Sequence, residues 1–139
     1  MSDCSEGRDA QVDRDLAARL RRAIQSAFEG DSNLQRRGRH LETRCLVQIG
    51  SERLLLEIHA GRPRVAEQIP LLCSWAFALR ADAKAWSALW QPVPAPGSHD
   101  VLALYKRGEM QIEGNLQPLM ANLQYFKDLV TLPREGEGR

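Results

Sequence analysis

The sequence predicts an α+β domain in which helices cover one face of a mainly antiparallel sheet. Apolar residues near the N-terminus recur at helical spacing, and those in the middle of the chain recur in short strand-like runs. The last apolar segment changes from strand to helix without a loop. We therefore expect a helix, three or four strands, two helices, a strand and a final helix.

Length and composition fit one globular domain. The chain has 139 residues, of which 43% are hydrophobic and 27% are charged. We expect a disordered tail over residues 1–11, a single domain over residues 12–132 and a second disordered tail over residues 133–139. The formal net charge of +1 provides no general attraction to nucleic acid, so no nucleic-acid partner is expected.

The cysteines and the N-terminus together predict a cytoplasmic protein. Cys4, Cys45 and Cys73 are widely spaced and form no zinc-type pair, which fits a reducing compartment. The first residues, "MSDCSEGRDAQVDRD", are polar where a secretory signal needs an apolar core. No apolar run approaches the length of a membrane span, so we expect neither export nor insertion.

The first helix is predicted from a stripe of apolar residues at four-residue steps, namely Val12, Leu16, Leu20, Ile24 and Phe28. Gly30 and Asp31 should end it. Six arginines concentrate in this helix and just after it, namely Arg19, Arg21, Arg22, Arg36, Arg37 and Arg39, and a solvated face is the simpler interpretation of them. The alternative is a transient contact of this arginine-rich helix with an anionic membrane surface.

Two short aliphatic runs follow, "TRCLVQIG" and "RLLLEIHAG", which the pair Gly50-Ser51 joins as in a β-hairpin. The next turn falls at residues 61–63, and a weaker strand is expected over residues 64–68. The run "CSWAFALRA" predicts a further strand with Trp75, Phe77 and Leu79 on one bulky face.

Asp82 is the predicted N-cap of a helix over "AKAWSALW", which Pro92 should stop. Trp86, Leu89 and Trp90 share one face of this helix, because they stand at positions i, i+3 and i+4. The proline-rich "QPVPAPGSHD" is expected to be a stiff connector before a short helix over residues 100–106.

The segment "MQIEGNLQPLMANLQYFKDLV", residues 110–130, predicts the last strand and the last helix. Gly114 should break the strand, Asn115 should cap the helix, and Pro118 falls in its first turn. The helix is expected to run without a break, with an apolar face that includes Leu116, Leu119, Met120, Leu123 and Val130.

The sequence contains no motif for a catalytic reaction. His40, His59 and His99 lack metal-ligand spacing, so neither a metal nor a cofactor is expected. A nucleophilic Cys45 or Cys73 beside a histidine is less favoured than a buried, unreactive cysteine. Ser98, His99 and Asp100 resemble half of a catalytic arrangement, but capping of the following helix is the better interpretation. An enzyme is therefore ranked last.

All three tryptophans lie in one short region, although aromatic residues make up only 6% of the chain. Either they fill the core, or they line a slot for an apolar ligand together with methionine side chains. Spacing alone leaves both alternatives open.

The step "MQIEGNLQPLM" resembles the sterol carrier protein type 2 family, particularly its stand-alone bacterial members. Members typically pass from the last strand into the last helix through a hydrophobic-x-hydrophobic-x-Gly-Asp/Asn sequence, and Met110, Ile112, Gly114 and Asn115 match it here. The helix "DAKAWSALW" and the element order agree with the same family. The resemblance covers residues 75–129 most clearly.

The resemblance implies a five-stranded sheet with helices packed around a hydrophobic tunnel, and binding of a fatty-acyl, quinone or sterol-like molecule without catalysis. A protein partner could receive that ligand. The residues expected to contact it are Trp75, Phe77, Trp86, Leu89, Trp90, Ile112, Leu116, Met120 and Leu123. The alternative function is a protein-binding or accessory subunit with a closed, ligand-free core and an exposed apolar patch around Leu102, Tyr105 and the prolines.

Overall fold

The computed structural model describes residues 3–30, 32–66, 68–69, 74–91 and 100–133. The helices and strands follow one another in the order that the sequence predicts, apart from one additional short helix near the N-terminus and a division of the last helix. The elements are α1 (Asp3–Gly30), α2 (Ser32–Arg37), β1 (Glu42–Ile49), β2 (Glu52–His59), β3 (Arg62–Val65), β4 (Phe77–Ala81), α3 (Ala83–Leu89), α4 (Val101–Lys106), β5 (Met110–Gly114), α5 (Gln117–Ala121) and α6 (Leu123–Val130).

The five strands form one mixed sheet in the order β3-β2-β1-β4-β5. The pairings β1–β2, β2–β3 and β4–β5 are antiparallel, whereas β1 and β4 are parallel. An α+β fold with a five-stranded sheet is confirmed, and the expectation of antiparallel pairing fails at the centre. The chain leaves β3 at one edge and re-enters the sheet beside β1, and this crossover makes the β1–β4 pair parallel.

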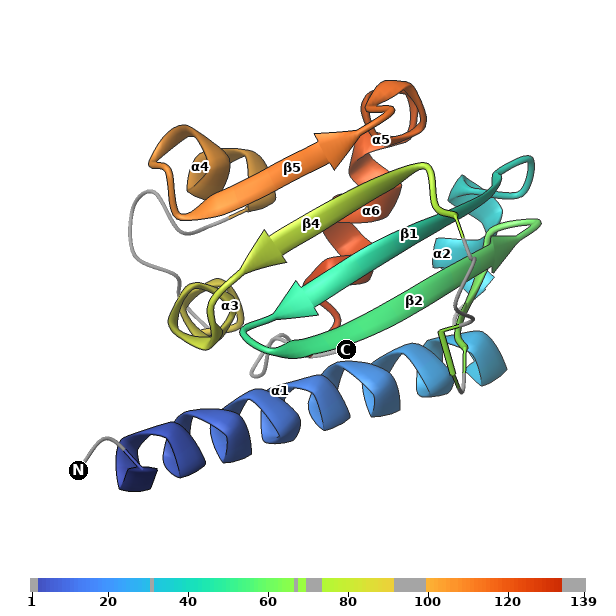
Figure 1. Cartoon of the computed structure of the whole chain (residues 1–139). Helices are drawn as coiled ribbons and strands as arrows, with labels where there is room; N and C mark the ends of the chain where they lie inside the picture. The colour runs from blue at the N-terminus through green and yellow to red at the C-terminus, as the bar shows by residue number, and fades with distance from the viewer. Residues whose placement is uncertain (1–2, 31, 67, 70–73, 92–99, 134–139) are drawn as a thin grey trace.

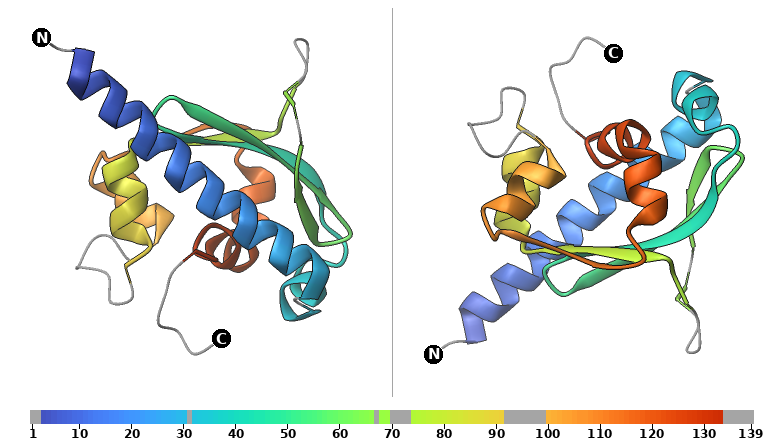
Figure 2. Two further views of the ribbon diagram at one scale, coloured as in Figure 1. Left: turned by 90° about the horizontal axis from the view of Figure 1, so that it is seen from below. Right: turned by 90° about the horizontal axis from the view of Figure 1, so that it is seen from above.

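The helices gather on one side of the sheet (Figures 1 and 2). Helix α6 lies behind the central strands, α3 and α4 lie near one end of the sheet, and α1 packs along β2 and β3. Alternate strand residues, among them Cys45, Val47, Leu56 and Leu79, point into the core between these two layers. The core therefore lies between the covered face of the sheet and the helices, and both layers contribute residues to it.

Helix α1 begins earlier than the sequence predicts, because it already includes Asp3. It ends at Gly30 as expected. Leu16, Leu20 and Ile24 are buried, but Val12 is 47% exposed. Asp13 is buried instead, and its carboxylate accepts hydrogen bonds from Ser51 N (3.0 Å) and Ser51 Oγ (3.1 Å) at the turn between β1 and β2. The four-residue apolar spacing thus identified the helix but not its first buried residue.

Helix α2 was missed, because its sequence is dominated by polar and basic residues. Among the side chains of this helix that the structure describes, Leu34 alone is buried in the main core. The β1–β2 hairpin is confirmed. β3 is shifted, because it begins at Arg62, inside the predicted turn, and ends at Val65. β4 is shorter than the predicted strand, because it begins at Phe77. Burial in the sheet, which a periodicity pattern does not measure directly, sets these ends.

Both predicted N-caps of the middle helices are confirmed. Asp82 accepts a hydrogen bond from Ala85 N (2.9 Å), and Asp100 accepts one from Ala103 N (2.8 Å). Asp100 therefore has a structural role at the start of α4. Most of the proline-rich connector, with Ser98 and His99, lies outside the described residues, as does the segment 134–139.

The prediction of one unbroken final helix is wrong. The helix is divided at Asn122, whose backbone has φ −128° and ψ 40°. The Asn122 side chain donates to Pro118 O (3.0 Å), the same carbonyl oxygen that accepts from Asn122 N (3.2 Å). Leu116, rather than Asn115, is the N-cap of α5, although Asn115 Oδ1 accepts from Gln117 N (3.1 Å). The expected single apolar stripe is thereby split between two short helices.

Candidate ligand-binding site

The residues expected to contact a ligand occupy three different environments. Phe77, Trp86, Leu89 and Trp90 are at most 2% exposed and belong to the main core. Trp75, Ile112 and Leu123 are half-buried, and the last two pack against that core. Leu116 is 37% exposed and Met120 is 54% exposed. The set therefore runs from the protein interior to its surface.

The inner part of this set is held by its own polar contacts. The Trp86 indole Nε1 donates to Gln48 O (2.9 Å), and the Trp90 indole Nε1 donates to Val130 O (2.7 Å). The two rings lie 5.9 Å apart, and the Arg19 guanidinium lies 5.3 Å from the centre of the Trp90 ring. These contacts make the tryptophan pair a fixed wall between α1, α3 and α6.

Helix α5 forms the outer part. Leu116 and Met120 are one helical turn apart, and Met120 N donates to Leu116 O (2.9 Å), so both side chains lie on the same side of this helix. Leu119, between them, is 1% exposed and anchors the opposite side in the core. The helix has no side-chain hydrogen bond at its N-cap and is interrupted at Asn122. Such a short, weakly capped helix is a suitable element to move when a ligand enters.

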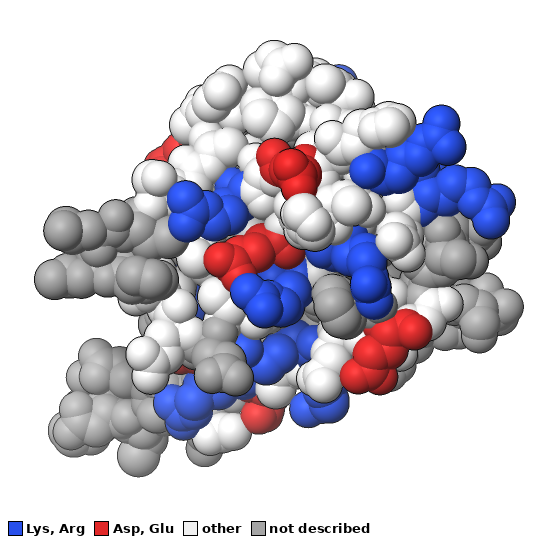
Figure 3. Space-filling model, turned by 90° about the vertical axis from the view of Figure 1, so that its right-hand side faces the viewer, with Lys and Arg blue, Asp and Glu red and all other residues white. Residues whose placement is uncertain are grey.

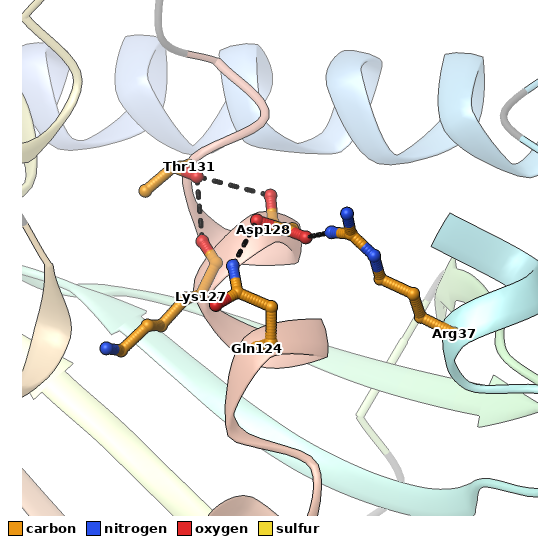
Figure 4. Close-up of polar contacts among 5 residues, drawn as sticks. All are labelled: Arg37, Gln124, Lys127, Asp128 and Thr131. Atoms are coloured by element: carbon orange, nitrogen blue, oxygen red, sulfur yellow. Dashed lines mark hydrogen bonds and ion pairs between the residues drawn. The ribbon is translucent and has the colours of Figure 1, made fainter. Parts of the chain in front are cut away.

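A cationic groove lies next to α5. It has a volume of about 730 Å³ and is lined by Arg36, Arg37, Gly38, Arg39, His40, Leu41 and Asn122. Arg37 forms an ion pair with Asp128 of α6, and Gln124 Nε2 also donates to Asp128 Oδ1 (2.9 Å) (Figure 4). The groove thus lies between the loop after α2 and the junction of α5 and α6.

Tyr125 supports this groove from inside the protein. Its hydroxyl group donates to Gly61 O (2.8 Å), and the tyrosine is 2% exposed. A Cβ atom at Gly38 would lie 2.7 Å from the Tyr125 ring, so only glycine allows the loop to pass this close. Sequence patterning did not single out Tyr125, because this residue lies outside the apolar stripe that was predicted for the last helix.

A second groove of about 610 Å³ lies between α1 and β3. It is lined by Arg21, Gln25, Glu29, Glu57, Pro63, Arg64, Val65 and Ala66. Its charges are mixed, and Arg64 forms an ion pair with Glu57 (2.7 Å). Because the two signs are balanced along its walls, this groove provides no clear selection for a charged ligand.

The described residues offer little for catalysis. Burial raises the pKa of the Cys45 thiol to about 12, so this cysteine is a neutral thiol at physiological pH. His59 is exposed and contacts Glu42, and His40 lines the cationic groove. Within the described part of the chain, no three His, Cys, Asp or Glu side chains cluster as a metal ion would require. Cys73 and His99 lie outside that part.

Comparisons with known proteins identify the fold. No family model and no curated protein matches the sequence. Among solved structures, a crystal structure of sterol carrier protein 2 superimposes with a TM-score of 0.61 at 16% identity, over 85% of this chain and 95% of that one. The chain has the fold of sterol carrier protein 2.

Two further sterol carrier structures support this assignment of the fold. A conserved hypothetical protein of Thermus thermophilus, described as "possibly sterol carrier protein", gives a TM-score of 0.55 at 15% identity over 87% of this chain and 90% of that one. The sterol carrier protein domain 2 of Helicoverpa armigera gives 0.51 at 13% identity over 81% and 84%. The resemblance to sterol carrier proteins that the sequence suggested is confirmed for the fold.

One further property bears on location. Across the described residues, no helix combines the length and the apolar character that crossing a bilayer demands.

Proposed function

We propose that this protein binds a hydrophobic, lipid-like molecule, such as a fatty-acyl, quinone or sterol-like compound, and presents it to a partner without catalysing a reaction. The observation that carries the proposal is the apolar surface of α5. Leu116 and Met120 are exposed, and Ile112 and Leu123, which flank α5 in the sequence, are half-buried against the core of a chain whose fold is that of sterol carrier protein 2. Surface apolar residues that continue into an apolar core favour an apolar ligand.

In this proposal the ligand enters beneath α5. Leu116, Met120, Ile112 and Leu123 form the entrance of the tunnel, and the inner wall consists of Trp75, Phe77, Trp86, Leu89 and Trp90. Four of the wall residues are at most 2% exposed without a ligand, so α5 must move outward for an acyl chain to reach them. The weak N-cap and the break at Asn122 lower the cost of moving α5.

The energetics of such binding are favourable. Burying a chain of sixteen carbons contributes about 13 kcal/mol at about 0.8 kcal/mol per CH₂. The loss of translational and rotational freedom offsets at least about 4 kcal/mol of this. The remaining roughly 9 kcal/mol corresponds to a micromolar Kd or slightly tighter, before the cost of moving α5 is subtracted. Carriage of a lipid therefore needs no strong polar contact.

Native mass spectrometry of the gently purified protein, followed by solvent extraction, tests the proposal directly. A bound lipid of defined mass is the expected result. The matched test is uptake of a fluorescent acyl probe by Leu116→Gln/Met120→Gln, compared with Val12→Gln, which changes an equally exposed apolar residue on α1. We expect at least tenfold weaker uptake in the α5 variant only. An empty protein that takes up no probe contradicts the proposal.

The second candidate is a protein-binding subunit with a closed core, and one observation favours it. Tyr105 on α4 is 50% exposed beside half-buried Leu102, as in a small docking surface. This alternative predicts that Tyr105→Ser abolishes co-purification of a specific partner and that no lipid is extracted. If the purified chain carries lipid and Tyr105→Ser changes nothing, the alternative is excluded.

Contact with an anionic membrane remains a prediction for α1. Arg21 and Arg22 are exposed, whereas Arg19 is engaged with Trp90 and donates to Pro133 O (3.0 Å). Each basic residue near an anionic surface contributes about 1 kcal/mol. We expect the protein to float with anionic liposomes at low salt and to lose this binding at high salt or in Arg21→Gln/Arg22→Gln. Equal flotation of the variant argues against the contact.

A further inference from the structure

The cationic groove beside α5 carries an excess of positive charge. Its lining residues include three arginines and His40 but no carboxylate. Arg37 is neutralised by Asp128. Arg36 and Arg39 are exposed, and within the described residues neither forms an ion pair. Two guanidinium groups are therefore available to an anion from outside the chain.

The loop that carries these cations is held in place. Gly38 N donates to Leu34 O (3.3 Å), Leu41 N donates to Gly38 O (2.7 Å), and Gly61 N donates to Leu41 O (3.3 Å). The ring of Tyr125 fills the space beneath Gly38. An anion that binds here meets cations on a defined backbone, so less of the binding energy is lost in ordering the loop.

The groove borders the exposed apolar surface of α5. Asn122 lines the groove and directly follows the last residue of α5. Met120, which is 54% exposed, is two residues before Asn122, and two residues span at most about 7 Å. On the molecular face shown in Figure 3, Lys and Arg side chains gather beside an uncharged area, with acidic side chains also present. A cationic and an apolar surface thus lie side by side.

We propose that this groove binds the anionic head group, a carboxylate or a phosphate, of an amphiphile whose apolar chain lies against α5. The proposal rests on the proposed function and adds the chemical class of its ligand. Guanidinium groups form bidentate hydrogen bonds with either anion. Because Arg36 and Arg39 are exposed, solvent screening keeps each contribution modest. The groove therefore selects the head group, and the chain provides most of the affinity.

Matched ligands separate the contribution of the head group to affinity from that of the apolar chain. The Kd values of hexadecanol, hexadecanoate and hexadecyl phosphate, together with that of inorganic phosphate, are measured at low salt and below the concentrations at which the amphiphiles form micelles. We expect both anionic amphiphiles to bind about tenfold more tightly than hexadecanol. Inorganic phosphate alone should bind far more weakly than hexadecyl phosphate, because it lacks the chain.

Two double variants test whether the arginines of the cationic groove cause the preference for anionic amphiphiles. Arg36→Gln/Arg39→Gln should remove the preference for anionic amphiphiles while leaving the Kd for hexadecanol unchanged. The control Arg53→Gln/Lys84→Gln removes the same formal charge from exposed positions on β2 and α3, and it should keep the preference. Raising the salt concentration should weaken the preference of the wild type and of the control variant, since it screens the contacts of Arg36 and Arg39 that both retain.

Each outcome supports or overturns the assignment. If hexadecanol and the anionic amphiphiles bind equally well, or if the groove variant keeps the preference, the head-group site is wrong while the proposed lipid-binding function stands. If no amphiphile binds, both fail together. If inorganic phosphate binds as tightly as hexadecyl phosphate, and Leu116→Gln/Met120→Gln has no effect on either, the groove is a site for free anions and the amphiphile proposal is overturned.

Discussion

At the scale of single residues, the core is held by buried polar atoms that each find a defined partner. Within the described residues, no buried side-chain nitrogen or oxygen lacks a hydrogen bond. The indoles of Trp86 and Trp90 and the hydroxyl of Tyr125 each bond a backbone carbonyl of a different segment. These bonds fix the orientation of large rings that apolar packing alone would leave less defined.

Trp90→Phe tests this role. The substitution leaves Val130 O without its 2.7 Å partner and removes part of a ring that is 2% exposed. We expect the free energy of unfolding to fall by about 2 to 4 kcal/mol, as measured by urea denaturation. The control Tyr105→Phe changes a half-exposed side chain and should change stability by less than about 0.5 kcal/mol. Equal losses in both variants would mean that the indole bond is unimportant.

Cys45 provides a second test at this scale. Burial raises the pKa of its thiol to about 12 from an ordinary value of 9.0, so the nucleophilic thiolate is absent at pH 8. In a Cys4→Ser/Cys73→Ser variant, we expect a thiol reagent to label Cys45 only after denaturation. Between these two pKa values the unfolded chain binds fewer protons than the folded one, so stability falls as the pH rises above about 9. Rapid labelling of the native variant would contradict this burial.

At the scale of elements, the step from β5 into α5 depends on Gly114. Its φ of +97° lies in the region that favours glycine, and a Cβ atom there would lie 2.6 Å from Ala76 O. The following residue contacts the same carbonyl group just before β4, because Asn115 N donates to Ala76 O (2.7 Å). The motif that suggested the sterol carrier resemblance thus has a physical reason, namely a close approach of two backbones just before the proposed ligand entrance.

Gly114→Ala and Gly108→Ala separate the conformational cost of a positive φ from the cost of a steric clash with the backbone. Both glycines have positive φ, +97° and +78°, but a Cβ atom at Gly108 would meet nothing within 4 Å. Gly108→Ala should therefore cost only the conformational term of about 1 to 2 kcal/mol. Gly114→Ala should cost about 1 to 3 kcal/mol more, because it adds a backbone clash. Thermal denaturation measures the difference, and equal Tm values would show that the close approach does not matter.

At the scale of the whole molecule, periodicity predicted the elements better than their pairing. The apolar spacing of Leu16, Leu20 and Ile24 and the capping residues Asp82 and Asp100 were sufficient to locate three helices. The parallel β1–β4 pair depends on where the chain crosses over, which no local pattern encodes. The burial of Leu34, which anchors α2 in the core, was equally hard to predict from the sequence, because the neighbouring residues are polar or basic.

The candidate site was predicted less completely than the fold. The apolar residues of the α5 segment were found from their helical spacing, but the break at Asn122, where the backbone has φ −128° and ψ 40°, falls inside an unbroken apolar stripe and left no sign in that spacing. The cationic groove was missed for a different reason. Its arginines are adjacent in sequence to polar residues and looked like a solvated surface, and only the fold places Asn122 across from them.

Hydrogen exchange across the whole chain tests how the site opens. Amides of the three inner strands β2, β1 and β4 should exchange slowest, because these strands pair on both sides, and those of α5 should exchange fast, because this helix is short and weakly capped. On addition of hexadecanol, protection should rise mainly in α5 and the start of α6, since a chain beneath α5 must displace and then reorder it. In α3, whose tryptophan already has its indole bonded, protection should change little. A uniform rise across all elements, or none in α5, would mean that the ligand binds elsewhere and that the apolar residues of α5 serve another surface.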